Sequence, residues 1–244
     1  MEPQTLLFVI LTLITLNFIL EQWLDYLNLK KQSPVLPREL KDFYDEEKYL
    51  KSVQYQNART RFSFVTSTLS FIVFFALVIS GFFGFLDSWL REGIVNDIWL
   101  SLAFFGILYF ASDLLSLPFQ IYNTFVIEEK FGFNKSTVKV FIADKLKGYL
   151  VTILLGGGIL ALFIWLISSI GNSFWIYFWV ISGVLMLLIN MFYTSIFIPL
   201  FNKLTPLQEG SLRTRIENYG KQVNFPIESI FVIDGSKRST KANA

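Results

Sequence analysis

The 244-residue sequence contains no histidine and no cysteine. Without His the chain lacks the commonest metal ligand and the usual general base near neutral pH. Without Cys it has neither disulfides nor thiolate metal ligands. Charged residues make up only 16% of the chain, whereas an average soluble domain has about 25%. The chain therefore lacks the side chains that most catalytic centres use, and its low charge argues against a soluble protein.

Apolar and aromatic residues are abundant, at 53% and 18% of the chain. A helix needs about 20 mainly apolar residues to cross the hydrocarbon of a bilayer. The sequence has five such segments, at residues 5–24, 62–85, 98–117, 149–170 and 174–200. It therefore predicts an all-α multi-pass membrane protein with a membrane domain over residues 1–200.

Basic residues are concentrated in alternate connections between these segments. Residues 21–61, 116–148 and 201–244 together hold 20 Lys and Arg, whereas the remaining connections hold only Arg91. The positive-inside rule then predicts an N-terminus outside or in a lumen and a C-terminus in the cytoplasm.

Two connections are predicted to be helical. The stretch "DEEKYLKSVQYQNARTRF" is typical of a helix that leads into the second span. The stretch "STVKVFIADKLKGYL" has apolar residues at three-to-four-residue spacing and indicates an interfacial helix that enters the fourth span, with Ser136 as its N-cap.

The character of the chain changes after Leu200. Leu212, Ile216, Tyr219 and Val223 have the spacing of an amphipathic soluble helix, and "NFPIESIFVID" predicts a turn and a short strand. One strand and one helix cannot bury their own faces, and a piece this short is marginal alone. We expect residues 201–244 to begin a cytoplasmic domain whose remainder lies beyond Ala244. The alternative is a tail that docks on the membrane helices or on a partner.

Three polar residues lie within the predicted spans. Asp113 is costly in hydrocarbon, so it either faces a watery interior or reaches head-group water near the end of its span. Asn17 and Asn190 suit interhelical hydrogen bonds, and a wet cavity is the alternative.

Other charged groups are weaker candidates. Glu128 and Glu129 are adjacent on a helix and point about 100° apart, which makes a poor acid/base pair and favours the start of a solvated loop. Lys237, Arg238 and Lys241 suit a solvated loop, or contact with anionic lipid or a substrate carboxylate. They form no basic stripe of the kind that binds nucleic acid.

Two longer stretches resemble one known family. They are "LPFQIYNTFVIEEKFGFNKST", residues 117–137, and "PLFNKLTPLQEGSLRTRIENYGKQVNFPIESIFVIDGSKRSTKANA", residues 199–244. Both are similar to the type I CAAX prenyl endopeptidases, which are membrane zinc metalloproteases. The resemblance implies five N-terminal spans followed by a protease region, and cleavage of prenylated or membrane-associated proteins.

The resemblance also implies zinc bound by an H-E-x-x-H helix and a downstream Glu. A chain without His cannot contain that motif, so we expect no catalytic and no metal-binding residue in these 244, which should be inactive alone. The protease part would be supplied in cis or in trans. The membrane would be the endoplasmic reticulum in a eukaryote and the plasma membrane in a bacterium.

The resemblance further implies two sets of site residues. Asn243 and Ala244 match the beginning of an edge strand that binds extended peptide. Asn17, Asp113 and Asn190 would line a water-filled chamber between the spans. Two other function classes stay open. One is a non-catalytic scaffold or partner subunit, which would need no His. The other is a transporter, which only the intramembrane polar residues support.

Overall fold

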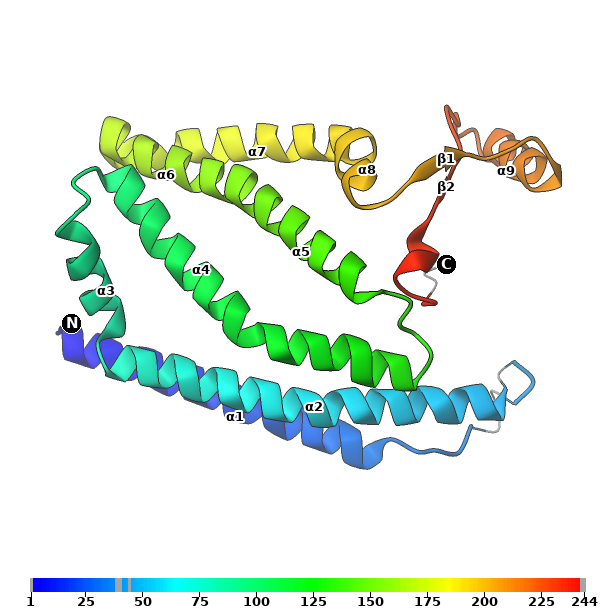
Figure 1. Cartoon of the computed structure of the whole chain (residues 1–244), viewed down its shortest axis with the longest axis horizontal. Coiled ribbons are helices and arrows are strands. Elements are labelled where there is room, and N and C mark those ends of the chain that lie inside the picture. The colour runs from blue at the N-terminus through cyan, green and yellow to red at the C-terminus, as the bar shows by residue number, and fades with distance from the viewer. Residues whose placement is uncertain (1, 38–40, 44, 242–244) are drawn as a thin grey trace. The chain divides into compact units, whose positions relative to one another are not determined.

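The structure is a computed structural model that describes residues 2–37, 41–43 and 45–241, and helices dominate it (Figure 1). Its contacts divide the chain into two units. One comprises the chain up to Asn96 together with Ala103–Asn134, and the other comprises Asp97–Leu102 together with the chain from Lys135 onward.

The first unit is built from long helices. These are α1 (Pro3–Lys31), α2 (Glu46–Ile79), α3 (Phe82–Arg91) and α4 (Asp97–Tyr122), which continues as the π-helical segment η2 (Asn123–Glu128). The helices α1 and α2 lie side by side, because Phe18 stacks on Phe71 with ring centroids 4.2 Å apart and Gln22 Nε2 donates to Ser67 Oγ at 2.8 Å (Figure 1).

The predicted helix that leads into the second span is confirmed. The helix α2 runs without a break from Glu46 to Ile79, and the Asp45 side chain caps it by accepting from Lys48 N at 2.9 Å. The helix that contains the predicted third span, residues 98–117, passes through Pro118 and continues to Glu128. Proline removes a single backbone donor, so it bends this helix (Figure 1) rather than ending it.

A compact cluster joins α2 to the end of η2. Buried Tyr55 of α2 packs against Ile127 and Phe131, and its ring lies edge-on to Phe133 at a centroid distance of 4.8 Å. The Tyr55 hydroxyl donates to the Glu128 carboxylate. The turn that brings Phe133 back passes through Gly132, whose φ of +75° strains any residue with a side chain. The cluster thus folds the distinctive stretch "IEEKFGFN" onto α2.

The second unit is helical throughout residues 138–201. Its elements are α5 (Val138–Val151), η3 (Thr152–Gly156), α6 (Gly157–Ile170), η4 (Gly171–Ser173), α7 (Phe174–Phe192), η5 (Tyr193–Phe197) and α8 (Ile198–Phe201). The chain reverses at Gly171, where φ is +65°. The Phe163 ring of α6 then packs on Phe174 and Phe178 of α7 at 5.5 and 4.8 Å.

The predicted N-cap of α5 is wrong by one residue. The Thr137 hydroxyl, not that of Ser136, accepts from Val140 N at 3.3 Å. The Ser136 hydroxyl instead donates to the carbonyl oxygen of Arg238 at 3.4 Å. Ser and Thr cap about equally well, so a contact remote in sequence decides between them.

After α8 the chain forms β1 (Leu204–Pro206), α9 (Ser211–Gln222), β2 (Phe231–Ile233) and η6 (Gly235–Lys237). The predicted helix and strand are confirmed. The strand is not left unpaired, however, because β1 and β2 are antiparallel with Leu204 opposite Ile233 and Pro206 opposite Phe231. The apolar face of α9 stays open, since Leu212 is 60% and Tyr219 is 66% exposed.

Within the part of the chain that the structure describes, four helical stretches are long and apolar enough to cross a membrane. They are Pro3–Lys31, Glu46–Ile79, Asp97–Glu128 and Val138–Phe201. The last of these contains the reversal at Gly171. Their apolar side chains are largely exposed, as at Trp179 (76%) and Leu187 (72%). A surface of this kind suits hydrocarbon rather than water.

The Tyr55 cluster yields a stability prediction. Removing the hydroxyl with Tyr55→Phe leaves the Glu128 carboxylate without this donor and should cost about 1–3 kcal/mol, while Tyr55→Ala should cost about 3–5 kcal/mol. Unfolding in detergent, followed by tryptophan fluorescence, measures both. Tyr49→Phe is the matched control, because the hydroxyl of Tyr49 makes only a longer 3.3 Å bond to the Ser33 carbonyl. Equal effects at both tyrosines would contradict a stabilising role for the cluster.

Candidate functional site

The three polar residues of the predicted spans lie on three different helices. Asn17 of α1 donates through Nδ2 to Glu21 Oε1 at 3.0 Å, and Asn190 of α7 donates to the Met186 carbonyl at 2.8 Å. Asp113 of α4 is half-buried and accepts from Gln120 Nε2 at 3.3 Å. Each of these bonds stays within one helix.

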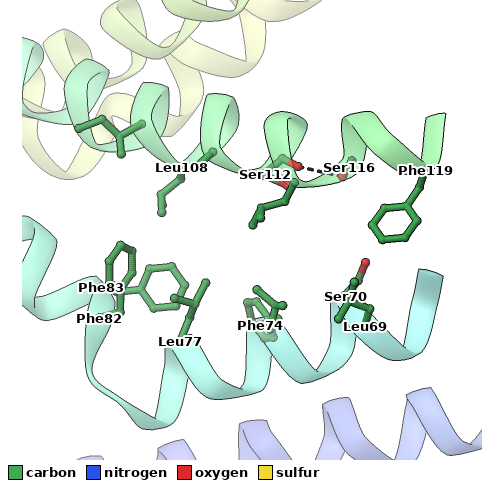
Figure 2. A pocket seen from close by; sticks show the side chains of 14 residues that line it. Leu69, Ser70, Phe74, Leu77, Phe82, Phe83, Leu108, Ser112, Ser116 and Phe119 are labelled. Atoms are coloured by element: carbon green, nitrogen blue, oxygen red, sulfur yellow. Dashed lines mark hydrogen bonds between the residues drawn. The ribbon is translucent and has the colours of Figure 1, made fainter. Parts of the chain in front are cut away.

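A cavity of about 500 Å³ lies between α2, α3 and α4. Figure 2 shows Phe74 and Leu77 of α2 facing Leu108 of α4 across it. The full lining is Leu69, Ser70, Val73, Phe74, Leu77, Phe82, Phe83, Ile107, Leu108, Ala111, Ser112, Leu115, Ser116 and Phe119. Apart from three serines it is apolar, which suits an alkyl chain better than a charged ligand.

None of Asn17, Asp113 and Asn190 lines this cavity. Asp113 is next in sequence to Ser112, which does line it, but successive residues of a helix point about 100° apart. Asn243 and Ala244, the expected start of a substrate-binding strand, lie outside the described residues. The roles expected for these five residues therefore stay predictions.

Glu128 and Glu129 do not begin a solvated loop. Glu128 accepts from the Tyr55 hydroxyl, and Glu129 Oε2 accepts from Asn134 Nδ2 at 3.0 Å. The two carboxylates thus serve different partners, in agreement with the expectation that they make a poor acid/base pair. Their role here is to fix the turn that ends η2.

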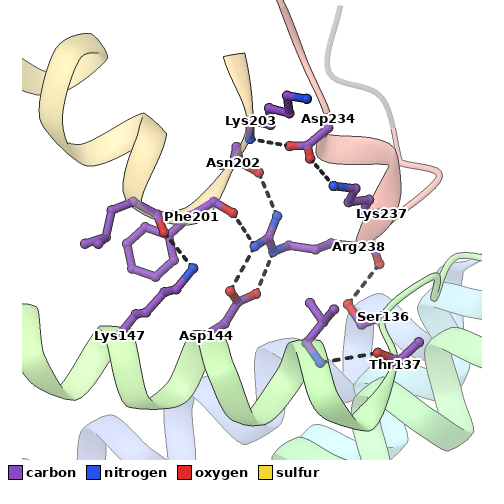
Figure 3. A network of polar contacts seen from close by, with 12 residues as sticks. Ser136, Thr137, Asp144, Lys147, Phe201, Asn202, Lys203, Asp234, Lys237 and Arg238 are labelled. Atoms are coloured by element: carbon purple, nitrogen blue, oxygen red, sulfur yellow. Dashed lines mark hydrogen bonds and ion pairs between the residues drawn. The ribbon is translucent and has the colours of Figure 1, made fainter. Parts of the chain in front are cut away.

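A second polar site lies where α5, the end of α8 and the segment after β2 meet (Figure 3). The guanidinium of Arg238 donates twice to the Asp144 carboxylate of α5, through Nε at 2.6 Å and Nη2 at 2.8 Å. Its Nη1 donates to Asn202 Oδ1 at 2.7 Å, and Nη2 also donates to the Phe201 carbonyl. One side chain therefore connects its own segment to two others.

The neighbours of Arg238 reinforce the same junction. Its own carbonyl accepts from Lys135 N at 3.0 Å. Asp234 accepts from Lys203 N at 2.7 Å and pairs with Lys237 at 2.5 Å. Lys147 of α5 donates to the Leu200 carbonyl at 2.8 Å. We call Asp144, Phe201, Asn202 and Arg238, with these surrounding bonds, the α5 anchor.

The electrostatics favour the charged forms at neutral pH. The hydrogen bonds to Asp144 raise the pKa of Arg238 above its ordinary value. The Lys237 ammonium, and then the Lys203 amide, lower the pKa of Asp234 below its ordinary 3.8. A carboxyl group whose pKa is lower in the folded than in the unfolded protein stabilises the fold at any pH above its unfolded-state pKa. That contribution to stability is lost only as the pH falls through the group's folded-state pKa. The Asp234 bonds are therefore complete at neutral pH.

Sequence reasoning missed the anchor. It placed Arg238 in a solvated loop, whereas the Arg238 and Asp144 side chains are only about a quarter exposed, at 27% and 25%. Lys237, at 63%, does match that description. The available signal was Asp144 itself, which is the one acidic residue in the sequence of α5.

The described residues do not fit a zinc site. The whole sequence has no His and no Cys. Across residues 2–37, 41–43 and 45–241, no group of three acidic side chains is placed to hold a metal. Zinc sites in proteins use three or four such ligands, so no chemical step on a metal can be assigned to this chain's residues.

Comparison with known proteins identifies the chain's relatives. Residues 25–203 match the family described as CAAX prenyl protease N-terminal, five membrane helices. CAAX prenyl protease 1 of Saccharomyces cerevisiae is 37% identical over 239 residues, which cover 93% of this chain and 53% of that protein. A CAAX prenyl protease 1 homolog of Arabidopsis thaliana is 36% identical over 238 residues, covering 93% and 55%.

A solved structure agrees with these relatives. The crystal structure of S. mikatae Ste24p superimposes with a TM-score of 0.86 at 34% identity, over 96% of this chain and 56% of that one. The chain spans about half the length of the relatives that it matches. Through residues 25–203, which make up most of its length, the chain belongs to the CAAX prenyl protease N-terminal family.

Proposed function

We propose that these residues are the N-terminal membrane part of a zinc metalloendopeptidase that cleaves prenylated or membrane-associated proteins. The observation that supports this is similarity over 93% of the chain to a protein named CAAX prenyl protease 1. The name specifies a protease acting on prenylated proteins. The fold similarity to Ste24p, at a TM-score of 0.86, supports the same reading.

The protein's chemistry would be divided between two parts of one protease. Zinc, when bound, activates a water for attack on the peptide carbonyl. Because the described residues do not fit a zinc site, we place the ligands in the half of the relatives that this chain does not cover, joined in cis or supplied in trans. The open apolar face of α9, with Leu212 and Tyr219, would pack against that part.

The membrane part would cross the bilayer five times. The stretch Val138–Phe201 reverses at Gly171, so its two arms would be separate spans. The distribution of 20 basic residues against one in alternate connections supports an outside or lumenal N-terminus and a cytoplasmic C-terminus. The host membrane would be the endoplasmic reticulum in a eukaryote and the plasma membrane in a bacterium.

The spans would form the wall of an intramembrane chamber. Its polar lining would include Asn17, Asp113 and Asn190, and its apolar cavity between α2 and α4 would admit a lipid tail. The cytoplasmic segment 201–244 would begin the protease domain, and Asn243 and Ala244 would begin the strand that pairs with the substrate peptide. This chain would thus hold the substrate while the missing part cleaves it.

The first test is to read the source gene past the codon for Ala244 and to assay the whole product. We expect an H-E-x-x-H motif, cleavage of a prenylated CAAX peptide, and loss of cleavage on treatment with a zinc chelator. Residues 1–244 alone should be inactive and serve as the control. A gene that stops at Ala244 would contradict a protease part joined in cis and favour a scaffold or partner subunit, whereas cleavage that persists in chelator would contradict a zinc mechanism.

A second test addresses the chamber. The chain has no native Cys, so single substitutions Asn17→Cys, Asp113→Cys and Asn190→Cys can be probed in membranes with a water-soluble maleimide. A wet chamber predicts labelling at these positions. Leu187→Cys is the lipid-facing control, because Leu187 is 72% exposed on an apolar helix, and it should stay unlabelled. Protection of all three polar positions would rule out the chamber assignment.

A third test addresses the substrate strand. In the full-length enzyme, Asn243→Ala should raise KM for the prenylated peptide by about three- to tenfold, since one hydrogen bond contributes about 0.5–1.5 kcal/mol. Lys241→Ala, two residues earlier, is the control and should leave KM unchanged. Unaltered cleavage and affinity in Asn243→Ala would remove Asn243 from the binding strand.

A further inference from the structure

We propose that Arg238 is a positioning residue for substrate, because the α5 anchor fixes where the chain leaves η6 toward the substrate strand. This inference rests on the proposed function, which places that strand at Asn243 and Ala244. The guanidinium of Arg238 is engaged by Asp144, Asn202 and the Phe201 carbonyl, so we place its effect on the substrate through the strand.

The anchor holds Arg238 from both ends. Its guanidinium is bound to Asp144, Asn202 and the Phe201 carbonyl, and its own carbonyl accepts from the Ser136 hydroxyl (Figure 3). The same carbonyl also accepts from Lys135 N. If only the side chain of Arg238 were bonded, the backbone at residue 238 could still rotate about that side chain. Bonds at the side chain and at the main chain together remove that freedom.

The two sides of the junction are also tied to each other. After α8 the chain continues through Asn202 and Lys203, and it comes back next to them at Asp234, whose carboxylate accepts from Lys203 N. The antiparallel pairing of β1 with β2 continues this contact. Residues 234–238 are therefore held against the end of α8 as well as against α5, and the anchor closes the loop formed by β1, α9 and β2.

The chemistry of the anchor calls for arginine. A planar guanidinium presents a fixed fork of donors that bonds both oxygens of one carboxylate and still reaches two further acceptors. A lysine ammonium is a point charge that cannot hold the same fork. If the anchor served only for charge neutralisation, Lys would replace Arg; if it fixes geometry, Lys would not.

The link to the substrate is short. Asn243 is the fifth residue after Arg238, and a fully extended chain over five residue steps reaches at most about 18 Å. We therefore expect a displacement of residue 238 to displace the start of the strand as well. Pairing of an extended peptide with a strand depends on register, so a loosened anchor should weaken substrate binding.

The test uses the full-length protein with Arg238→Ala, Arg238→Lys and Asp144→Asn. The matched control is Lys221→Ala, which removes an exposed cation of α9 that takes no part in the bonds of the anchor. Two readouts are taken: hydrogen exchange of peptides covering residues 201–207 and 230–241, and KM and kcat for a prenylated CAAX peptide, with the pH profile of kcat.

We expect exchange in both peptides to rise at least about tenfold in Arg238→Ala and Asp144→Asn, as when local opening becomes easier. KM should rise by about tenfold or more with an unchanged pH profile, and Arg238→Lys should recover little. Lys221→Ala should resemble the wild type in both readouts. If a variant fails to fold, Asn202→Ala removes one bond of the anchor and should show a smaller change of the same kind.

Three results would overturn the inference. Unchanged exchange would show that the anchor does not hold the segment. Faster exchange with unchanged KM would make Arg238 structural only, and so would full recovery by Arg238→Lys. If the wild-type protein cleaves nothing, the proposed function fails and substrate positioning fails with it, but the exchange data still report whether Arg238 holds residues 230–241.

Discussion

The rest of the structure depends on the need to satisfy every backbone polar group within the chain. In hydrocarbon no water is available to bond an open N–H or C=O, so a spanning segment must stay helical along its length. The chain meets this constraint even where its α-helices pass into π-helical segments. The π-helical segments Asn123–Glu128, Thr152–Gly156 and Tyr193–Phe197 continue the helix without a break, and the reversal at Gly171 follows a complete helix.

That constraint explains what could be predicted from the sequence. Apolar length alone located the helical stretches, because every apolar run long enough to span had to be a helix. It did not locate their ends. The helix that contains the predicted span 98–117 continues through Pro118 to Glu128, because this proline removes one backbone hydrogen bond without ending the helix.

The unpredicted features are contacts between residues far apart in sequence. The ion pair of Arg238 with Asp144 joins residues that are 94 positions apart in the sequence. A local sequence pattern cannot predict a contact between residues so far apart. The strand Leu204–Pro206 was missed because it has three residues, one of them a proline, and owes its form to pairing with β2. The choice of Thr137 over Ser136 as N-cap depends on the same remote partner, since Arg238 engages the Ser136 hydroxyl.

Such remote polar contacts matter more here than in a soluble protein. Lipid is as apolar as leucine, so the hydrophobic effect does not press one span against another. Packing then depends on close contact and on the few polar bonds between helices. Gln22 with Ser67 and Tyr55 with Glu128 are bonds of this kind, and each accompanies stacked or edge-on rings. A few specific contacts can therefore fix helices whose apolar surfaces would otherwise slide past one another.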